Sequence, residues 1–211
     1  SQSLIADIGE LDGLVAACGA RSNADAYGFE ARAYSAGTFQ SKGFGTFTPT
    51  AVLTEALGQS AINSTVGVAG GIDLEEVEPN TLAVVDGEWV QVTAVNLVGQ
   101  TVTLERGLLD TVPVSHAVGA RLWFVDGWRF YLTPEYVQNE VARVKLLPRT
   151  PKGTFAEAAA TELNLTLAKR FIRPYCPGNV RVNGLRYPGV ITGEPSASWA
   201  TRNRQSQTAY L

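Results

Sequence analysis

Apolar side chains recur at two different spacings along the chain, and the change in spacing separates a short helical start from a long β-rich remainder. Between Ser3 and Gly19 they recur every three or four residues, as on one face of an α-helix. They are Leu4, Ile5, Ile8, Leu11, Leu14, Val15 and Cys18. Ser3 can cap the start of such a helix and Gly19 stands where it would end. The pattern predicts one amphipathic helix of about 15 residues.

The next stretch is rich in glycine, serine, threonine and aromatic residues. A strand-like run extends from Tyr27 to Tyr34, and a glycine-containing segment that favours a loop follows it. With the helix, this stretch makes up a first region, residues 1–65.

Short apolar runs separated by turn residues then follow at roughly ten-residue spacing from Val66 to Val125. Asp86-Gly87 suits a two-residue type I′ turn, which pairs Val85 with Glu88 and Val84 with Trp89. The region 66–127 is therefore predicted to be a small antiparallel β barrel or sandwich.

Two further regions complete a mainly β chain. Residues 128–172 hold strand-like runs broken by prolines and are predicted to be a β-rich connecting region. Residues 173–211 contain a second turn sequence, Asn183-Gly184, which predicts a hairpin. This last region is too short for a complete β-sandwich domain, so we expect it to be part of a truncated one.

Composition narrows the functional classes. Of 211 residues, 45% are hydrophobic, and 17 Lys+Arg against 20 Asp+Glu give a net charge of −3, which disfavours wholesale nucleic-acid binding. Two distant cysteines exclude a disulfide-stapled mini-protein, and no apolar stretch is long enough for a membrane span. The chain has no methionine, even at position 1, so we expect a processed product or a piece of a longer protein.

Residues with catalytic or metal-binding chemistry are sparse. His116 is the only histidine and has no recognisable nucleophile or second imidazole in its neighbourhood, so a structural role is favoured. The acidic run Asp73, Glu75, Glu76 and Glu78 lacks the spacing of a calcium loop. We therefore predict no enzymatic activity, no metal and no cofactor.

Basic and aromatic residues gather near the C-terminus. Arg181, Arg186 and Trp199 are candidate interface residues, because arginine and aromatic side chains are enriched where proteins meet. The four tryptophans leave a second interpretation open, a carbohydrate-binding β module in which they stack on sugars; burial in a core is the simpler role for them. They are Trp89, Trp123, Trp128 and Trp199.

One string, residues 84–124, resembles a module that recurs in bacteriophage tail proteins. A D-G-E hairpin and a V-T-A-V strand lead to T-V-T-L-x-R-G, then to D-T-x-P-x-x-H and A-x-G-A-R. Residues 144–150 and 173–211 also look like segments of tail-tip or baseplate hub proteins, similar to the tip attachment protein of long-tailed phages. Cys176 departs from that pattern, where a proline or small residue is expected.

The resemblance implies a structural component of a tail tip, baseplate or central fibre, located in the virion and assembled in the host cytoplasm. Its expected partners are other tail proteins, further copies in a trimer, and a host surface receptor or glycan. It also implies that the last region opens a fibronectin-like module. A cell-wall-degrading enzyme is the remaining alternative, although no motif supports it. The shared positions expected to maintain the fold are Asp86, Gly87, Arg106, Gly107, Asp110, Pro113, His116 and Gly119.

Overall fold

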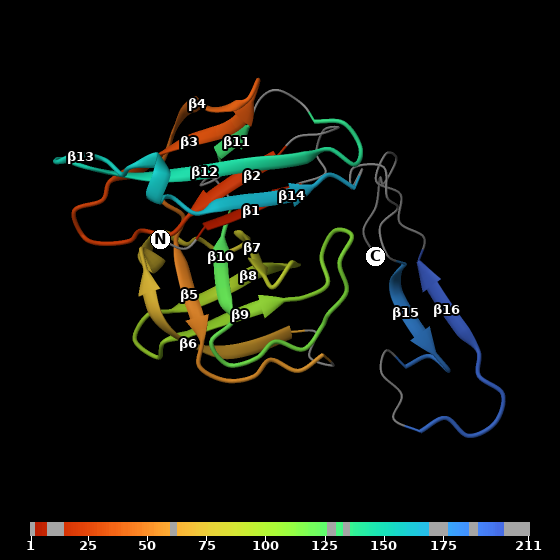
Figure 1. The fold of residues 1–211 in the computed structure, drawn as a ribbon. Coiled ribbons are helices and arrows are strands. Elements are labelled where there is room, and N and C mark those ends of the chain that lie inside the picture. The colour runs from red at the N-terminus through yellow and green to blue at the C-terminus, as the bar shows by residue number, and fades with distance from the viewer. Residues whose placement is uncertain are drawn as a thin grey trace.

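The computed structural model describes residues 3–7, 15–59, 63–125, 130–132, 136–168, 177–185 and 190–200. Within these ranges the chain is mainly β, with antiparallel pairing between its strands and two single-turn 3-10 helices. Figure 1 shows two packed β units, one above the other, and a two-stranded sheet to one side. The β class expected from the sequence is therefore confirmed.

The lower unit is a closed barrel in the strand order β10-β5-β6-β9-β8-β7, in which β7 pairs with β10. Its strands are β5 (Thr50–Leu53), β6 (Asn63–Ile72), β7 (Leu82–Val85), β8 (Glu88–Asn96), β9 (Thr101–Glu105) and β10 (Arg121–Phe124). The short helix η1 (Leu74–Glu76) connects β6 to β7. Of the two forms predicted from the spacing of the strands, a barrel or a sandwich, the barrel is present, and β5 with the first residues of β6 adds to it from before residue 66.

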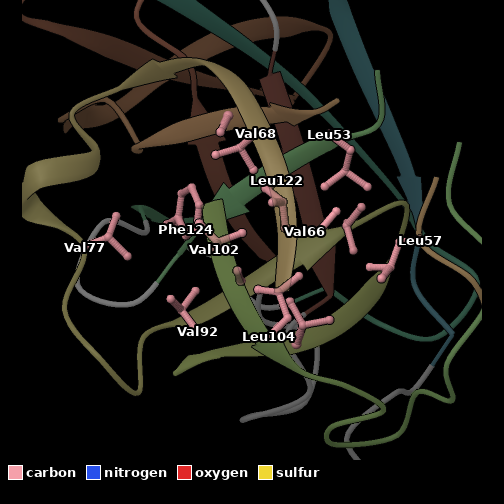
Figure 2. Close-up of a cluster of buried hydrophobic side chains, with 14 residues drawn as sticks. Leu53, Leu57, Val66, Val68, Val77, Val92, Val102, Leu104, Leu122 and Phe124 are labelled. Carbon is pink, nitrogen blue, oxygen red and sulfur yellow. The ribbon is translucent and has the colours of Figure 1, made fainter. Parts of the chain in front are cut away.

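Alternate residues of each barrel strand point inward, because successive side chains of a strand face opposite sides. Figure 2 shows the apolar cluster that fills the interior. Val102 and Leu104 on β9 and Leu122 and Phe124 on β10 are fully buried in it. Their neighbours Arg121 and Trp123 consequently lie on the outer surface of the barrel.

The β7–β8 hairpin has the register that its turn sequence predicts. Val85 pairs with Glu88 and Val84 with Trp89. The turn residues Asp86 and Gly87 have φ values of 46° and 85°, the left-handed backbone of a type I′ turn.

The upper unit consists of two sheets. β1 (Ser3–Asp7), β2 (Val15–Gly19) and β11 (Phe130–Leu132) form one of them, in that order. The other holds β3 (Gly28–Ser35), β4 (Thr38–Gly45), β12 (Val141–Thr150), β13 (Gly153–Thr154) and β14 (Glu162–Thr166). β14 lies beside β1 and β11 beside β4, so the two sheets enclose an apolar core of their own.

The barrel is inserted in the middle of the upper unit. Strands β1–β4 precede it in the sequence and β11–β14 follow it, yet β3 pairs directly with β12. The chain enters the barrel at Thr50 and leaves it after Phe124, and the neighbouring pair Thr50↔Trp123 places these two points side by side. Regions 1–65 and 128–172 of the sequence therefore share both sheets of the upper unit, an arrangement that the linear pattern does not reveal.

The expected N-terminal helix is wrong. Ser3–Asp7 and Val15–Gly19 are paired antiparallel strands; the residues between them lie outside the described ranges. Val15 and Ala17 pack into the core of the upper unit, whereas Ala16 and Cys18 pack against the barrel strands through Val84, Trp89 and Trp123. A strand buried on both faces is apolar at consecutive positions, so its spacing does not distinguish it from a helix.

The separate two-stranded sheet contains β15 (Gly178–Val182) and β16 (Ala197–Ala200). The predicted turn at Asn183-Gly184 is confirmed: both residues have positive φ, and Val182 and Leu185 exchange backbone hydrogen bonds. Residues 186–189, which follow this turn, lie outside the described ranges. Within the described part of the chain, no helix has the length and apolar character needed to cross a membrane.

Ala16→Leu and Ala17→Leu, made separately, are each expected to lower the free energy of unfolding by about 1–3 kcal/mol, because each overfills a different closely packed core. Urea denaturation measures both values. The control Ala158→Leu, on the exposed surface of η2 (Glu157–Ala159), should change stability by less than about 0.5 kcal/mol. If either core variant were as stable as this control, β2 would not be packed on both faces.

Candidate functional site

Charged side chains close one end of the barrel above its apolar core. Glu88 begins β8 and has the inward orientation of Val90, while Arg106 follows β9 and continues the inward series of Val102 and Leu104. His116 comes from the long loop between β9 and β10. The side chains of Glu88, Arg106 and His116 are at most 1% exposed, so this buried charge cluster is sealed from solvent.

The Glu88 carboxylate is the centre of the buried charge cluster. Its Oε1 accepts hydrogen bonds from Arg106 Nε at 2.9 Å and from the Gly107 N–H. Its Oε2 lies 2.9 Å from His116 Nε2 and also accepts from the Val114 N–H and from the second guanidinium nitrogen of Arg106. The two oxygens thus contact four residues of the loop 106–116, namely Arg106, Gly107, Val114 and His116. These contacts fix the loop over the barrel end.

Arg106 and His116 extend the network outward. The Arg106 guanidinium also donates to the carbonyl of Gly58, at 2.7 Å, and to that of Val114. His116 Nδ1 lies 3.0 Å from Oδ2 of Asp86, the turn residue of the β7–β8 hairpin, whose side chain is 56% exposed. Because carboxylate oxygens only accept hydrogen bonds, the imidazolium form satisfies both contacts and the neutral ring only one.

Opposing influences act on the Glu88 carboxyl. Burial raises its pKa, but hydrogen bonds from Arg106, Val114 and His116 and the charge of Arg106 outweigh burial, and the net direction is below its ordinary value of 4.5. In the folded protein the Glu88 carboxylate therefore stays ionised to a lower pH than an ordinary glutamate does.

The remaining motif positions shape the same loop. Gly107 has a φ of 70°, and a Cβ there would lie 2.8 Å from Pro113 Cδ, so no larger residue fits without a shift. Gly119 also has a positive φ, and its N–H donates to the carbonyl of Leu53. Asp110 is half-buried in the loop between Gly107 and Pro113. Asp86, Arg106, Gly107 and His116, which lie as many as 30 positions apart in the sequence, therefore meet around one barrel end.

A cavity of about 540 Å³ lies between the two β units. The barrel side contributes Val52, Arg121 and Trp123, and the upper unit contributes Leu146, Phe155 and Thr161. Arg121 Nη1 donates to Thr50 Oγ1 at 3.1 Å, and its guanidinium lies 5.8 Å from the centre of the Trp123 ring. Burial lowers the pKa of Arg121.

The outer face of the β4-β3-β12 sheet carries arginines stacked on aromatic rings. Arg143 lies 3.8 Å from the centre of the Tyr34 ring and Arg149 lies 4.2 Å from that of Phe44. Tyr34 and Phe44 are 38% and 61% exposed, so this stacked face presents large rings to solvent.

The other residues singled out in the sequence are dispersed. Asp73 of the acidic run pairs with Arg21 at 2.8 Å, and the described residues contain no group of three or more side chains arranged to hold a metal ion. Trp89 and Trp123 are buried, whereas Trp199 on β16 is 59% exposed; Trp128 lies outside the described ranges. Arg181 donates to the Gly184 carbonyl within its hairpin, and Arg186 also lies outside the described ranges.

No family model matches the chain, and no curated protein sequence matches it.

Sequence reasoning selected Asp86, Arg106 and His116 by resemblance but missed Glu88, to which Arg106 and His116 bind directly. The hairpin register contained the missing information, because pairing Val85 with Glu88 puts the carboxylate on the barrel's inner face. A buried carboxylate needs a cation, and the alternation of side chains along β9 points Arg106 into the barrel as well. Arg121 and the cavity were not accessible to the same reasoning, because the cavity forms between units that are distant in sequence.

Arg106→Ala is expected to lower the free energy of unfolding by about 3–5 kcal/mol, because it leaves Glu88 buried without its main cation. Chemical denaturation measures the loss. The control is Arg143→Ala, which removes an arginine whose pair with Glu162 is open to water and should cause a much smaller loss. Equal losses in the two variants would show that the buried charge cluster contributes no more than a surface pair.

Lowering the pH is expected to reduce the free energy of unfolding, because Glu88 becomes protonated. Its pKa is lower in the folded state than in the unfolded state, so its contribution is complete above the unfolded value near 4.5 and is lost as pH falls through the folded value. The stability gap between the natural chain and Glu88→Gln should therefore shrink as pH falls from about 5 to about 3. Denaturation curves at several pH values test this, with Glu105→Gln as the control for an exposed carboxylate at the end of β9. A gap that stays constant with pH contradicts the assignment.

Proposed function

We propose that the chain is a structural component of a bacteriophage tail tip, baseplate or central fibre, which contributes to tail assembly and host attachment through protein contacts. In this proposal it belongs to the virion tail, is assembled in the host cytoplasm and has no enzymatic activity. The observation that carries the proposal is that four tail-protein motif positions, Asp86, Arg106, Gly107 and His116, meet around the Glu88 carboxylate.

That convergence supports the resemblance in a specific way. If the likeness of residues 84–124 were accidental, Arg106, Gly107 and His116 would have no reason to bind one buried carboxylate. Instead Arg106, Gly107 and His116 all bind Glu88, and Pro113 occupies the space that a side chain at position 107 would need. Such residues maintain the shape of a module, which is the role expected of positions shared between structural proteins.

The stacked face of the upper unit supports the contact-making part of the proposal. Arginine and tyrosine are enriched at protein interfaces, and aromatic rings held by cations lose little freedom when a partner covers them. Tyr34, Phe44, Arg143 and Arg149 offer such a surface for another tail subunit. We also propose that β15 and β16, with Arg181 and Trp199, belong to a fibronectin-like module that makes further contacts.

Labelling of phage particles tests the location. Antibodies raised against the purified chain, coupled to gold, are expected to mark the tail end of particles from the phage that encodes it in electron micrographs, and to reduce adsorption of those particles to host cells. Particles that carry no label, while the same antibodies detect the full protein in infected cells, would refute a virion role.

The mass in solution tests the assembly. Light scattering of the 22.5 kDa chain over a range of concentrations is expected to give three times the monomer mass. In the same experiment Tyr34→Ala should lower the trimer fraction if the stacked face forms the contact, whereas Val98→Ala, on the exposed β8–β9 turn, should not. A monomer at every concentration contradicts the trimer.

A further inference from the structure

The cavity between the two units contains a cation that the described structure leaves without an opposite charge. Arg21, Arg32, Arg106 and Arg143 each lie within ion-pair distance of a carboxylate. Among the described residues, the Arg121 guanidinium has Thr50 Oγ1 as its hydrogen-bond partner and the Trp123 ring as its aromatic neighbour. Burial lowers its pKa, and no carboxylate of the described residues lies within ion-pair distance of its guanidinium.

The guanidinium has donors to spare. Arginine carries five N–H groups, and Arg121 uses one on Thr50 Oγ1. None of its nitrogens is a buried atom without a hydrogen-bond partner. The N–H groups that have no protein acceptor are therefore exposed to the cavity that Arg121 lines. A half-buried guanidinium with free donors in a concave site is arranged to receive a planar anion, because its fork matches both oxygens of a carboxylate.

The other lining residues determine what kind of molecule can carry the anionic group. The cavity volume, about 540 Å³, is within the range of small-ligand sites and leaves room for a monosaccharide or disaccharide. Phe155 is 49% exposed at the rim and offers a ring on which the apolar face of a sugar can pack. Ser3 and Thr161 supply hydroxyl groups for hydrogen bonds.

We propose that this cavity binds a carboxylate-bearing sugar, with the carboxylate on Arg121 and the ring against Phe155. One cation in the lining matches a singly charged carboxylate better than a doubly charged phosphate. The assignment is independent of the proposed tail role, because it uses the space between the units and neither the buried charge cluster nor the stacked face.

The test is a titration of the full ¹⁵N-labelled chain with glucuronate and with glucuronamide, its neutral isostere, followed by amide chemical shifts. Glucuronate is expected to shift the amides of Gly119 and Thr161 at the cavity and to bind at least about tenfold more tightly than glucuronamide, since only it carries the charge. Equal binding of the two sugars, or no shift with glucuronate, would overturn the proposal.

Variants locate the binding. Arg121→Gln should weaken glucuronate binding about tenfold or more, whereas Arg149→Gln, a matched arginine stacked on Phe44 away from the cavity, should leave it unchanged. Phe155→Ala provides a second test that does not alter the barrel, and should also weaken binding. Wild-type affinity in Arg121→Gln refutes the site. So does binding of an oligoglutamate peptide through Arg121 without binding of glucuronate, because the occupant would then be a protein carboxylate.

Discussion

The structure depends on the need to neutralise one carboxylate inside a β barrel. Glu88 occupies an inward position that an apolar side chain would otherwise fill, and a lone buried charge there would be prohibitively unfavourable. Its partners are Arg106, His116 and two backbone N–H groups, so satisfying the charge also fixes a long loop that has little regular structure. A buried ion pair adds little net stability over an apolar pair, but it specifies one loop conformation and disfavours others.

Local signals predicted the barrel well. Asp86-Gly87 and Asn183-Gly184 adopt the left-handed turns that their residue types favour, and the register of the first hairpin follows from its turn. The N-terminal strands were missed because their environment is not local. Ala16 and Cys18 face the barrel while Val15 and Ala17 face the upper core, and only the assembled protein makes both faces of that strand apolar. The glycines at positions 9 and 13 were the available warning, since glycine is unfavourable inside a helix.

For the candidate sites too, some features follow from the local sequence and others only from how the folded units pack together. The motif positions could be found along the chain by resemblance. To find Glu88 from the sequence, one needs to know which side chains of the barrel strands point inward, in addition to the motif. The cavity required the relative placement of β10 and the segment from Phe155 to Thr161, which meet only after the two units pack. Sequence patterns report which side of a strand is buried, but they do not report what lies opposite.

The insertion of the barrel has a consequence for the order in which the protein folds. Pairing β3 with β12 in an unfolded chain would close a loop of about a hundred residues, which carries a substantial entropic cost. Once the barrel has formed, the adjacent residues Thr50 and Trp123 hold the two flanking segments together, and most of that cost has already been met. The barrel contains shorter-range pairings, such as the β7–β8 hairpin, that can form first. The barrel is therefore the template on which the upper unit is completed.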